Sequence, residues 1–260
     1  MIGAIRTADD ARWYRLSIAA LIVLAWAVLA AWGISPFRGL LSHRPIGETA
    51  VSPIIRFVVF VLGWTLMTIA MMLPSSLPLV NLFRRVATGR PDRARLTARV
   101  ILGYLSIWAL FGAFAYRADG LVHAAVNQSP FLAARASWIA AAILLVAGIY
   151  QFTPLKHMCL EKCRSPYSFL VEHWRGGSAA SDALRLGWRH GLFCLGCCWT
   201  LMLLMFAIGG ANLGWMLTLG AIMAAERTTR WGRHVTRPLG ITLVALAVLE
   251  AAGVVVFPAG

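Results

Sequence analysis

Residues 191–225 read GLFCLGCCWTLMLLMFAIGGANLGWMLTLGAIMAA and carry no charged side chain. About 20 consecutive, mostly apolar residues are enough for a helix to cross the hydrocarbon core of a bilayer. The chain as a whole has 260 residues, of which 60% are hydrophobic and 13% charged, a composition typical of a membrane protein. The sequence therefore predicts an all-α fold, a polytopic transmembrane helical bundle that forms a single integral membrane domain over residues 1–260.

Comparable apolar runs recur along the chain, and we predict about seven spans. They lie at Leu16–Gly33, Ile54–Leu73, Val100–Tyr116, Ala136–Phe152, Gly191–Ile208, Leu213–Ala225 and Leu239–Pro258. The sixth is short and follows the break at Gly209-Gly210, so the fifth and sixth spans form either a helical hairpin or a re-entrant pair. Val28-Leu29-Ala30 resembles a signal-peptide cleavage site, but the long basic start containing Asp9 and Asp10 favours a retained first span.

The net charge of +14 is distributed unevenly between the loops. Most of the 24 lysine and arginine residues fall in four segments, 6–15, 84–99, 156–189 and 227–237. In the predicted order of spans, these four segments all lie on the same side of the membrane. Because cytoplasmic loops are rich in Lys and Arg, this pattern predicts an N-in/C-out protein of a bacterial inner (cytoplasmic) membrane. The basic charge then faces the lipid bilayer and no nucleic acid partner is expected. The segment 153–190 becomes a cytoplasmic loop.

All five cysteines fall within one part of the chain, at Cys159, Cys163, Cys194, Cys197 and Cys198. The first two are four residues apart and the last three have i, i+3, i+4 spacing, so each group lies on one face of a helix. Cytosolic thiols are normally kept reduced, which argues against a disulfide framework. Cysteines that only fill space would seldom gather at such spacings. We therefore predict a thiolate metal site in which the two groups share one ion.

A helix is predicted to carry the first cysteine pair toward the second group. Thr153-Pro154 has the sequence of an N-cap followed by proline at the first helical position. Lys156, Lys162 and Arg164 flank the cysteine pair, and cations beside a thiol lower its pKa and stabilise the anion. Further on, Tyr167–Trp174 has amphipathic spacing and predicts a short helix on the inner interface.

Methionines extend the sulfur set into the bundle. Met202 and Met205 continue the face of Cys198, while Met71 and Met72 end the second span. Thiolate and thioether ligands with few carboxylates favour Cu(I), with Zn(II) as the second choice. We predict these four methionines as transfer sites for a metal moving toward the membrane centre, the alternative being that they fill gaps between helices.

Other polar residues receive lesser roles. Gln151 and Glu226 end their spans beside the cysteines, where they either orient the ligands or simply face the interface. Glu250 lies in the last span, at the opposite end from the cysteines, and is predicted not to bind the metal. His190 belongs to a basic segment, as do His173 and His234, and is predicted to be solvated.

The residues support three hypotheses about function. The favoured one is Cu(I) handling, by transport or by delivery to a membrane cuproenzyme, with a metallochaperone or that cuproenzyme as the partner. The second is a membrane thiol-disulfide oxidoreductase that uses the paired cysteines, and the third is an assembly factor for membrane complexes. The chain contains no nucleotide-binding glycine loop, aspartyl-phosphate motif or nucleophile-histidine-acid set, which argues against an ATP-driven pump. No catalytic residue is predicted, and enzymatic activity is not expected.

Three stretches are specific enough to compare with a known family. They are WTLMTIAMMLP at 64–74, GIYQFTPLK at 148–156 with the cysteine pair, Arg164 and Pro166 after it, and GLFCLGCCW at 191–199. Together they resemble a bacterial family of predicted metal-binding integral membrane proteins, a domain of unknown function with Cys-rich motifs. The resemblance covers about residues 64–226, and it implies a multi-helix inner-membrane protein with metal ligands among the cysteines and a connection to copper. The chain departs from the family at Ala211, where methionine is expected, so no ligand is assigned to that turn.

Overall fold

The protein is described here from a computed structural model that covers residues 2–35, 52–133, 135–174, 178–208 and 212–254. The described residues form helices and turns without any β-strand, which confirms the predicted all-α class. The helices are α1 (Ile2–Gly33), α2 (Pro53–Met71), α3 (Leu73–Val86), α4 (Arg93–Gln128), α5 (Pro130–Ala133), α6 (Ala136–Tyr150), α7 (Pro154–Arg164), α8 (Pro166–His173), α9 (Ala179–Ile208), α10 (Leu213–Thr228) and α11 (Gly232–Ala251).

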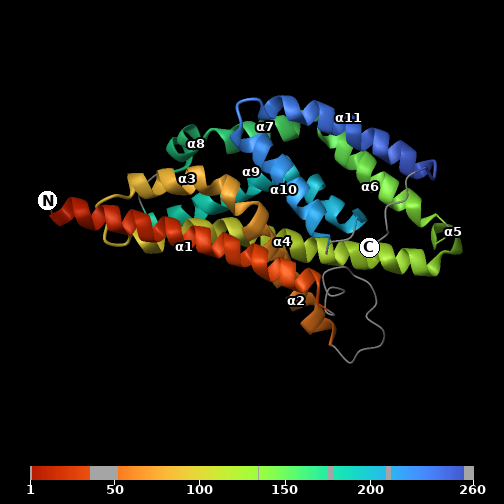
Figure 1. The fold of residues 1–260 in the computed structure, drawn as a ribbon, viewed down its shortest axis with the longest axis horizontal. Coiled ribbons are helices and arrows are strands. Elements are labelled where there is room, and N and C mark those ends of the chain that lie inside the picture. Colours follow the sequence, from red (N-terminus) through yellow and green to blue (C-terminus); the bar gives the residue numbers. More distant parts are fainter. Residues whose placement is uncertain (1, 36–51, 134, 175–177, 209–211, 255–260) are drawn as a thin grey trace.

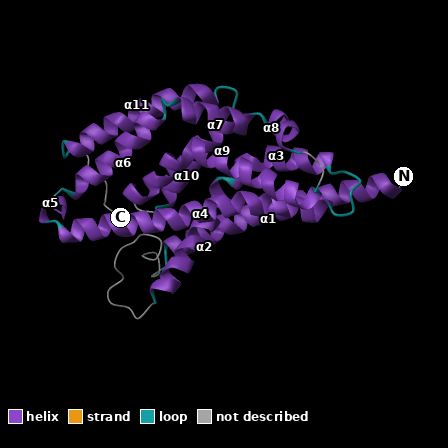
Figure 2. Ribbon diagram, turned by 180° about the vertical axis from the view of Figure 1, so that it is seen from behind, coloured by secondary structure: helices purple, strands orange, loops and turns teal. Residues whose placement is uncertain are grey.

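The helices are arranged around α9. Helices α1, α2 and α4 lie along one side of the elongated molecule, whereas α6, α7 and α11 lie along the other, with α9 and α10 between them (Figures 1 and 2). Helix α9 packs against α4, α6 and α7, and α10 packs against α2, α7, α9 and α11. The residues of α9 and α10 that carry chemistry are therefore enclosed by helices from both halves of the chain.

Glycines allow α9 to approach α4 closely. A Cβ atom at Gly187 of α9 would run into the carbonyl oxygen of Val100, and one at Gly103 of α4 would run into the carbonyl oxygen of Leu184. Small residues at helix contacts let backbones meet in this way, which is common between membrane helices. The segment predicted as a loop at 153–190 is largely helical, because α9 begins at Ala179, about three turns before the apolar part of the helix.

Prolines interrupt the chain between α2 and α3. Pro74, near the start of α3, has no amide hydrogen and cannot continue the hydrogen-bond ladder of α2. The carbonyl of Met72 at the break accepts hydrogen bonds from the hydroxyls of Ser75 and Ser76, at 2.9 and 3.2 Å. This break places Met72 and Ser75 beside the centre of the bundle.

Five described helical segments are long and apolar enough to cross a membrane, and the bent pair α6–α7 makes a sixth if it counts as one span. They are Arg12–Gly33, Pro53–Met71, Arg93–Gln128, Ala179–Met205 and Gly232–Ala251. Helix α10 has 16 residues and is not among them. The seven spans and the N-in/C-out orientation stay predictions. The predicted break at Gly209-Gly210 and the departure at Ala211 lie outside the described residues.

Candidate metal centre

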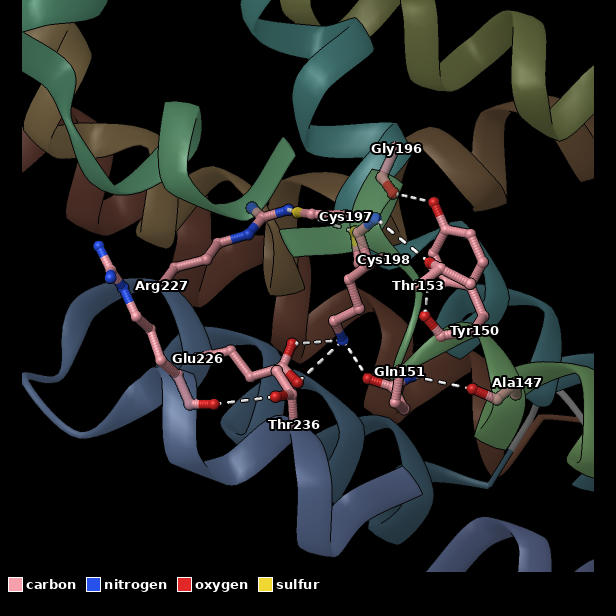
Figure 3. A network of polar contacts seen from close by, with 12 residues as sticks. Ala147, Tyr150, Gln151, Thr153, Gly196, Cys197, Cys198, Glu226, Arg227 and Thr236 are labelled. Atoms are coloured by element: carbon pink, nitrogen blue, oxygen red, sulfur yellow. Dashed lines mark hydrogen bonds and ion pairs between the residues drawn. The ribbon is translucent and has the colours of Figure 1, made fainter. Parts of the chain in front are cut away.

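The short helix α7 carries the first cysteine pair back onto α9. Thr153 caps it by accepting a hydrogen bond from the Lys156 amide at 3.3 Å, which confirms the predicted N-cap. The chain bends by 64° between α6 and α7, and the Tyr150 hydroxyl at the bend donates to the carbonyl of Gly196 in α9 (Figure 3). The bend and this hydrogen bond together direct Cys159 and Cys163 toward the cysteines of α9.

The structure brings four of the cysteines into one core cluster, with the partly buried Cys163 of α7 packed against it, and all five are free thiols. The thiols of Cys197 and Cys198 both donate to the Cys194 carbonyl, at 3.1 and 3.0 Å. Cys159 packs against Gly196, where an added Cβ atom would lie 2.6 Å from its sulfur. The sulfurs of α7 and α9 therefore share one space, as a jointly held ion requires.

A guanidinium group lies among these sulfur atoms. Arg227, near the end of α10, is buried and extends toward the cysteines (Figure 3). Its Nη2 donates to the Sγ atoms of Cys194, Cys197 and Cys198, at 2.8, 3.1 and 3.2 Å respectively. Its Nη1 donates to the Ser75 hydroxyl at 2.8 Å. Since a buried charge persists only when it is paired and hydrogen-bonded, the sulfur group forms a buried site for a cation.

The lysines expected to stabilise the thiols are engaged elsewhere. Lys156 is buried and donates to both carboxylate oxygens of Glu226, at 2.9 and 3.0 Å, and to the side-chain oxygen of Gln151. Lys162 pairs with Glu172 at 2.6 Å on the surface. The prediction that these lysines stabilise the thiols is wrong, because Arg227 occupies that position.

Helix α7 holds the end of α10 at two points. Besides the Lys156–Glu226 ion pair, Arg164 donates to the carbonyls of Glu226 and Thr229, the second at 2.7 Å. Burial raises the pKa of the Glu226 carboxyl, and the Lys156 ammonium acts in the opposite direction. Arg227 follows Glu226 in the chain, so a fixed Glu226 also fixes where Arg227 leaves the helix. Gln151 and Glu226 are thus internal positioning residues and not interfacial ones.

The predicted methionines line the core beside the cysteines. Met71, Met72, Met202 and Met205 are all buried in the cluster that contains the thiols. The sulfur of Met72 lies 3.9 Å from the sulfur of Cys198. Met216 and Met223 of α10, together with Met67 of α2, belong to the same cluster. Thioethers from three helices therefore adjoin the thiol group. This arrangement fits methionines that pass a metal ion along, and it also fits methionines that fill gaps between helices.

His190 lies in α9 and is buried, which contradicts the prediction that it is solvated. Neither nitrogen of its imidazole has a hydrogen-bond partner among the described residues. Its spacing of four residues from Cys194 was a usable signal, since residues i and i+4 share a helix face. Arg227 was also missed, because a basic residue just after an apolar run is typical of the positive-inside rule.

No group of three or more His, Cys, Asp or Glu side chains is arranged as a ready metal site within the ranges described above. The contacts of Arg227 explain why, because its guanidinium nitrogen lies between the sulfurs that a metal ion would bring together. Metal binding at these cysteines requires Arg227 to withdraw. The chemistry of the donors, three to five thiols with thioethers beside them, suits a soft cation.

The contact between Cys159 and Gly196 gives a test of the cysteine group. We expect Gly196→Ala to lower the affinity for Cu(I) about tenfold or more, equivalent to about 1.4 kcal/mol, because the new methyl group displaces the Cys159 sulfur. Competition with a chromogenic Cu(I) chelator measures the change. Gly120→Ala is the matched control, since a Cβ atom there meets no other atom within 4 Å. Equal affinity in both variants would place Cys159 outside the site.

Comparison with known proteins identifies one family. The sequence model of the PpoB2 family, described as a copper chaperone, matches residues 61–250. This range holds all five cysteines, Arg227 and the predicted methionines, and the match confirms the metal-related character that the resemblance implied. Neither the curated proteins nor the solved structures gave a match.

Proposed function

Because the chain belongs to the PpoB2 copper chaperone family and has a copper-handling role, we propose that it is a membrane-embedded Cu(I) chaperone. The thiols of α7 and α9 hold the ion, and the neighbouring methionines receive it on the way to a copper protein. Delivery is favoured over pumping, since the sequence contains no nucleotide-binding or phosphorylation motif.

One observation carries this proposal, namely the convergence of three cysteine sulfurs on a single buried cationic nitrogen. Such a set of donors holds positive charge away from water, and sulfur selects soft ions such as Cu(I) over Mg²⁺ and Ca²⁺. The methionine-rich core beside it supports copper further, because thioethers carry no charge and bind Cu(I) without losing a proton.

The direct test is the metal content of the full-length protein purified in detergent. We propose that it binds about one Cu(I) per chain tightly enough to withstand a chelator of moderate strength, and that it then passes the ion to an apo copper protein. Full occupancy by Zn(II) with no preference for Cu(I) would contradict the proposal. Thiols that cycle through disulfides without binding metal would favour the oxidoreductase alternative instead.

We further propose that the bundle lies in a bacterial inner membrane with α7 and α8 on the cytoplasmic side. Large apolar side chains are exposed on the outer faces of the candidate spans, among them Leu110 and Phe114 of α4 and Ile241 and Val248 of α11. Exposed apolar surface of this kind suits contact with lipid. The basic residues near α7, α8 and the end of α10 suit the cytoplasmic leaflet.

Topology can be tested at Ser178, between α8 and α9. In a variant with its native cysteines replaced by serine and Ser178→Cys introduced, we expect a membrane-impermeant thiol reagent to label the protein only after the inner membrane is opened. Labelling of intact spheroplasts would place this segment outside and would overturn the orientation. The same variant without Ser178→Cys controls for background labelling.

A further inference from the structure

The imidazole of His190 in α9 is buried against aromatic rings, and its nitrogens are unpaired among the described residues. His190 is 4% exposed, and both its ring nitrogens lack a hydrogen-bond partner within the part of the chain that the structure describes. Leaving a buried polar group unpaired costs about 1–3 kcal/mol. A histidine kept for packing alone would be replaced by an apolar ring of similar size without that loss, so the unpaired nitrogens point to a ligand.

Aromatic rings surround the imidazole and connect it to the thiols. The Tyr104 ring lies 5.5 Å from the His190 ring, and the Tyr104 hydroxyl is hydrogen-bonded to the Cys194 sulfur at 2.9 Å. Phe169 of α8 meets His190 edge-on at 5.6 Å. His190 and Cys194 lie on one face of α9, separated by about 6 Å along the helix axis. The imidazole of His190 and the thiol of Cys194 are thus neighbouring nitrogen and sulfur donors on the same face of α9.

We propose that His190 is a copper ligand, which together with Cys194 holds Cu(I) at the edge of the thiol group before the ion moves to Cys197 and Cys198. This inference rests on the proposed copper function and adds a nitrogen donor to it. Neutral imidazole suits copper, and two donors four residues apart on a helix can bind one ion. Binding at this edge requires Arg227 to release Cys194 first, while its contacts with Cys197 and Cys198 can break as the ion moves on.

A second histidine gives the route a direction. His173, at the end of α8, is partly exposed and stacks on Phe169 with the ring centres 4.3 Å apart. Its Nδ1 faces the Phe169 carbonyl at 2.9 Å, which leaves Nε2 for another partner. Because Phe169 touches both imidazoles, the order from the surface inward is His173, His190 and then Cys194. The ion therefore arrives from the side of α8.

X-ray absorption spectroscopy of the Cu(I)-loaded, full-length protein tests the ligand directly. We expect one nitrogen neighbour besides sulfur in the natural protein, and an all-sulfur shell in His190→Leu with about tenfold weaker affinity or more. His190→Met supplies a soft donor in place of the imidazole and is expected to restore most of the affinity without the nitrogen. The exposed His234 gives the matched control, because His234→Leu should change neither value.

The outcomes separate this inference from the proposed function. An all-sulfur shell in the natural protein, with equal affinity in His190→Leu, would overturn the ligand role of His190 and leave the thiol site intact. Failure of the natural protein to bind Cu(I) at all would overturn the proposed function itself. If His190→Leu does not fold, His190→Met decides alone: folding and affinity restored with nitrogen absent supports the inference, whereas a nitrogen neighbour that persists contradicts it.

Discussion

Replacement of Cys194 and Cys197 by serine is expected to yield a folded protein that no longer binds Cu(I) tightly. Both thiols contact the same guanidinium nitrogen, so removing them takes away two of the sulfurs that meet at the proposed ion position. The hydroxyl of serine is a harder donor and a poor ligand for Cu(I). Serine is close in size to cysteine, so the loss of stability should be modest, about 1 kcal/mol. Metal analysis after chelator washing, with circular dichroism as the check on folding, measures both effects.

The double variant Cys159→Ser/Cys163→Ser should lose copper to a similar degree, because its thiols reach the same space from α7. Combining all four substitutions should do no further harm, since one site can be dismantled only once. Met158→Ser is the matched control, as it removes a sulfur that is exposed on α7. If each double variant lost one ion independently of the other, the two cysteine pairs would form separate sites. Full copper content in either double variant would contradict a shared site.

Glu226→Gln is expected to destabilise the protein by about 3–5 kcal/mol, the effect of removing one partner from a buried ion pair. Lys156 is fully buried and would lose the carboxylate that pairs with it. Because Arg227 is the next residue, copper affinity should fall as well, although no sulfur is lost. Thermal unfolding in detergent and chelator competition measure the two effects.

Replacing both members of the ion pair by apolar residues shows whether the loss of stability comes from the unpaired charge or from altered packing. Lys156→Met/Glu226→Met removes both charges and should regain most of the lost stability, since apolar replacements of a buried ion pair are often neutral or stabilising. Glu250→Gln is the matched control, because Glu250 is as deeply buried but lies at the end of α11 opposite Gly232, the position that meets Glu226. Its copper stoichiometry should be unchanged. Loss of copper in Glu250→Gln would mean that the site is misplaced.

Local sequence patterns were enough to predict the elements that carry the site. The Thr153-Pro154 start of α7, the facing cysteine spacings and the helix after Ser165 all depend on neighbours within a few residues, and the structure has each of them. The start of α9 was placed too late, because hydropathy marks the apolar part of a helix and not its first turns.

The partners of the buried charges could not be predicted in this way. Arg227 meets cysteines about 30 positions earlier in the chain, and Lys156 meets Glu226 across 70 positions. Such pairs depend on how α7, α9 and α10 pack, which no local spacing encodes. His190 lies between these cases, since its helical spacing to Cys194 was visible but its burial was not.

The guanidinium among the sulfurs also bears on the valence of the ion that can replace it. Arg227 and Cu(I) each carry one positive charge, so exchanging them leaves the total charge inside the bundle unchanged. A divalent ion such as Zn(II) would add one more, in surroundings where an unbalanced charge costs several kcal/mol. It would have to be balanced by the ionisation of a further thiol. A monovalent ion can thus replace the arginine with one fewer ionised thiol than a divalent ion needs, which adds to the preference that sulfur itself provides for Cu(I).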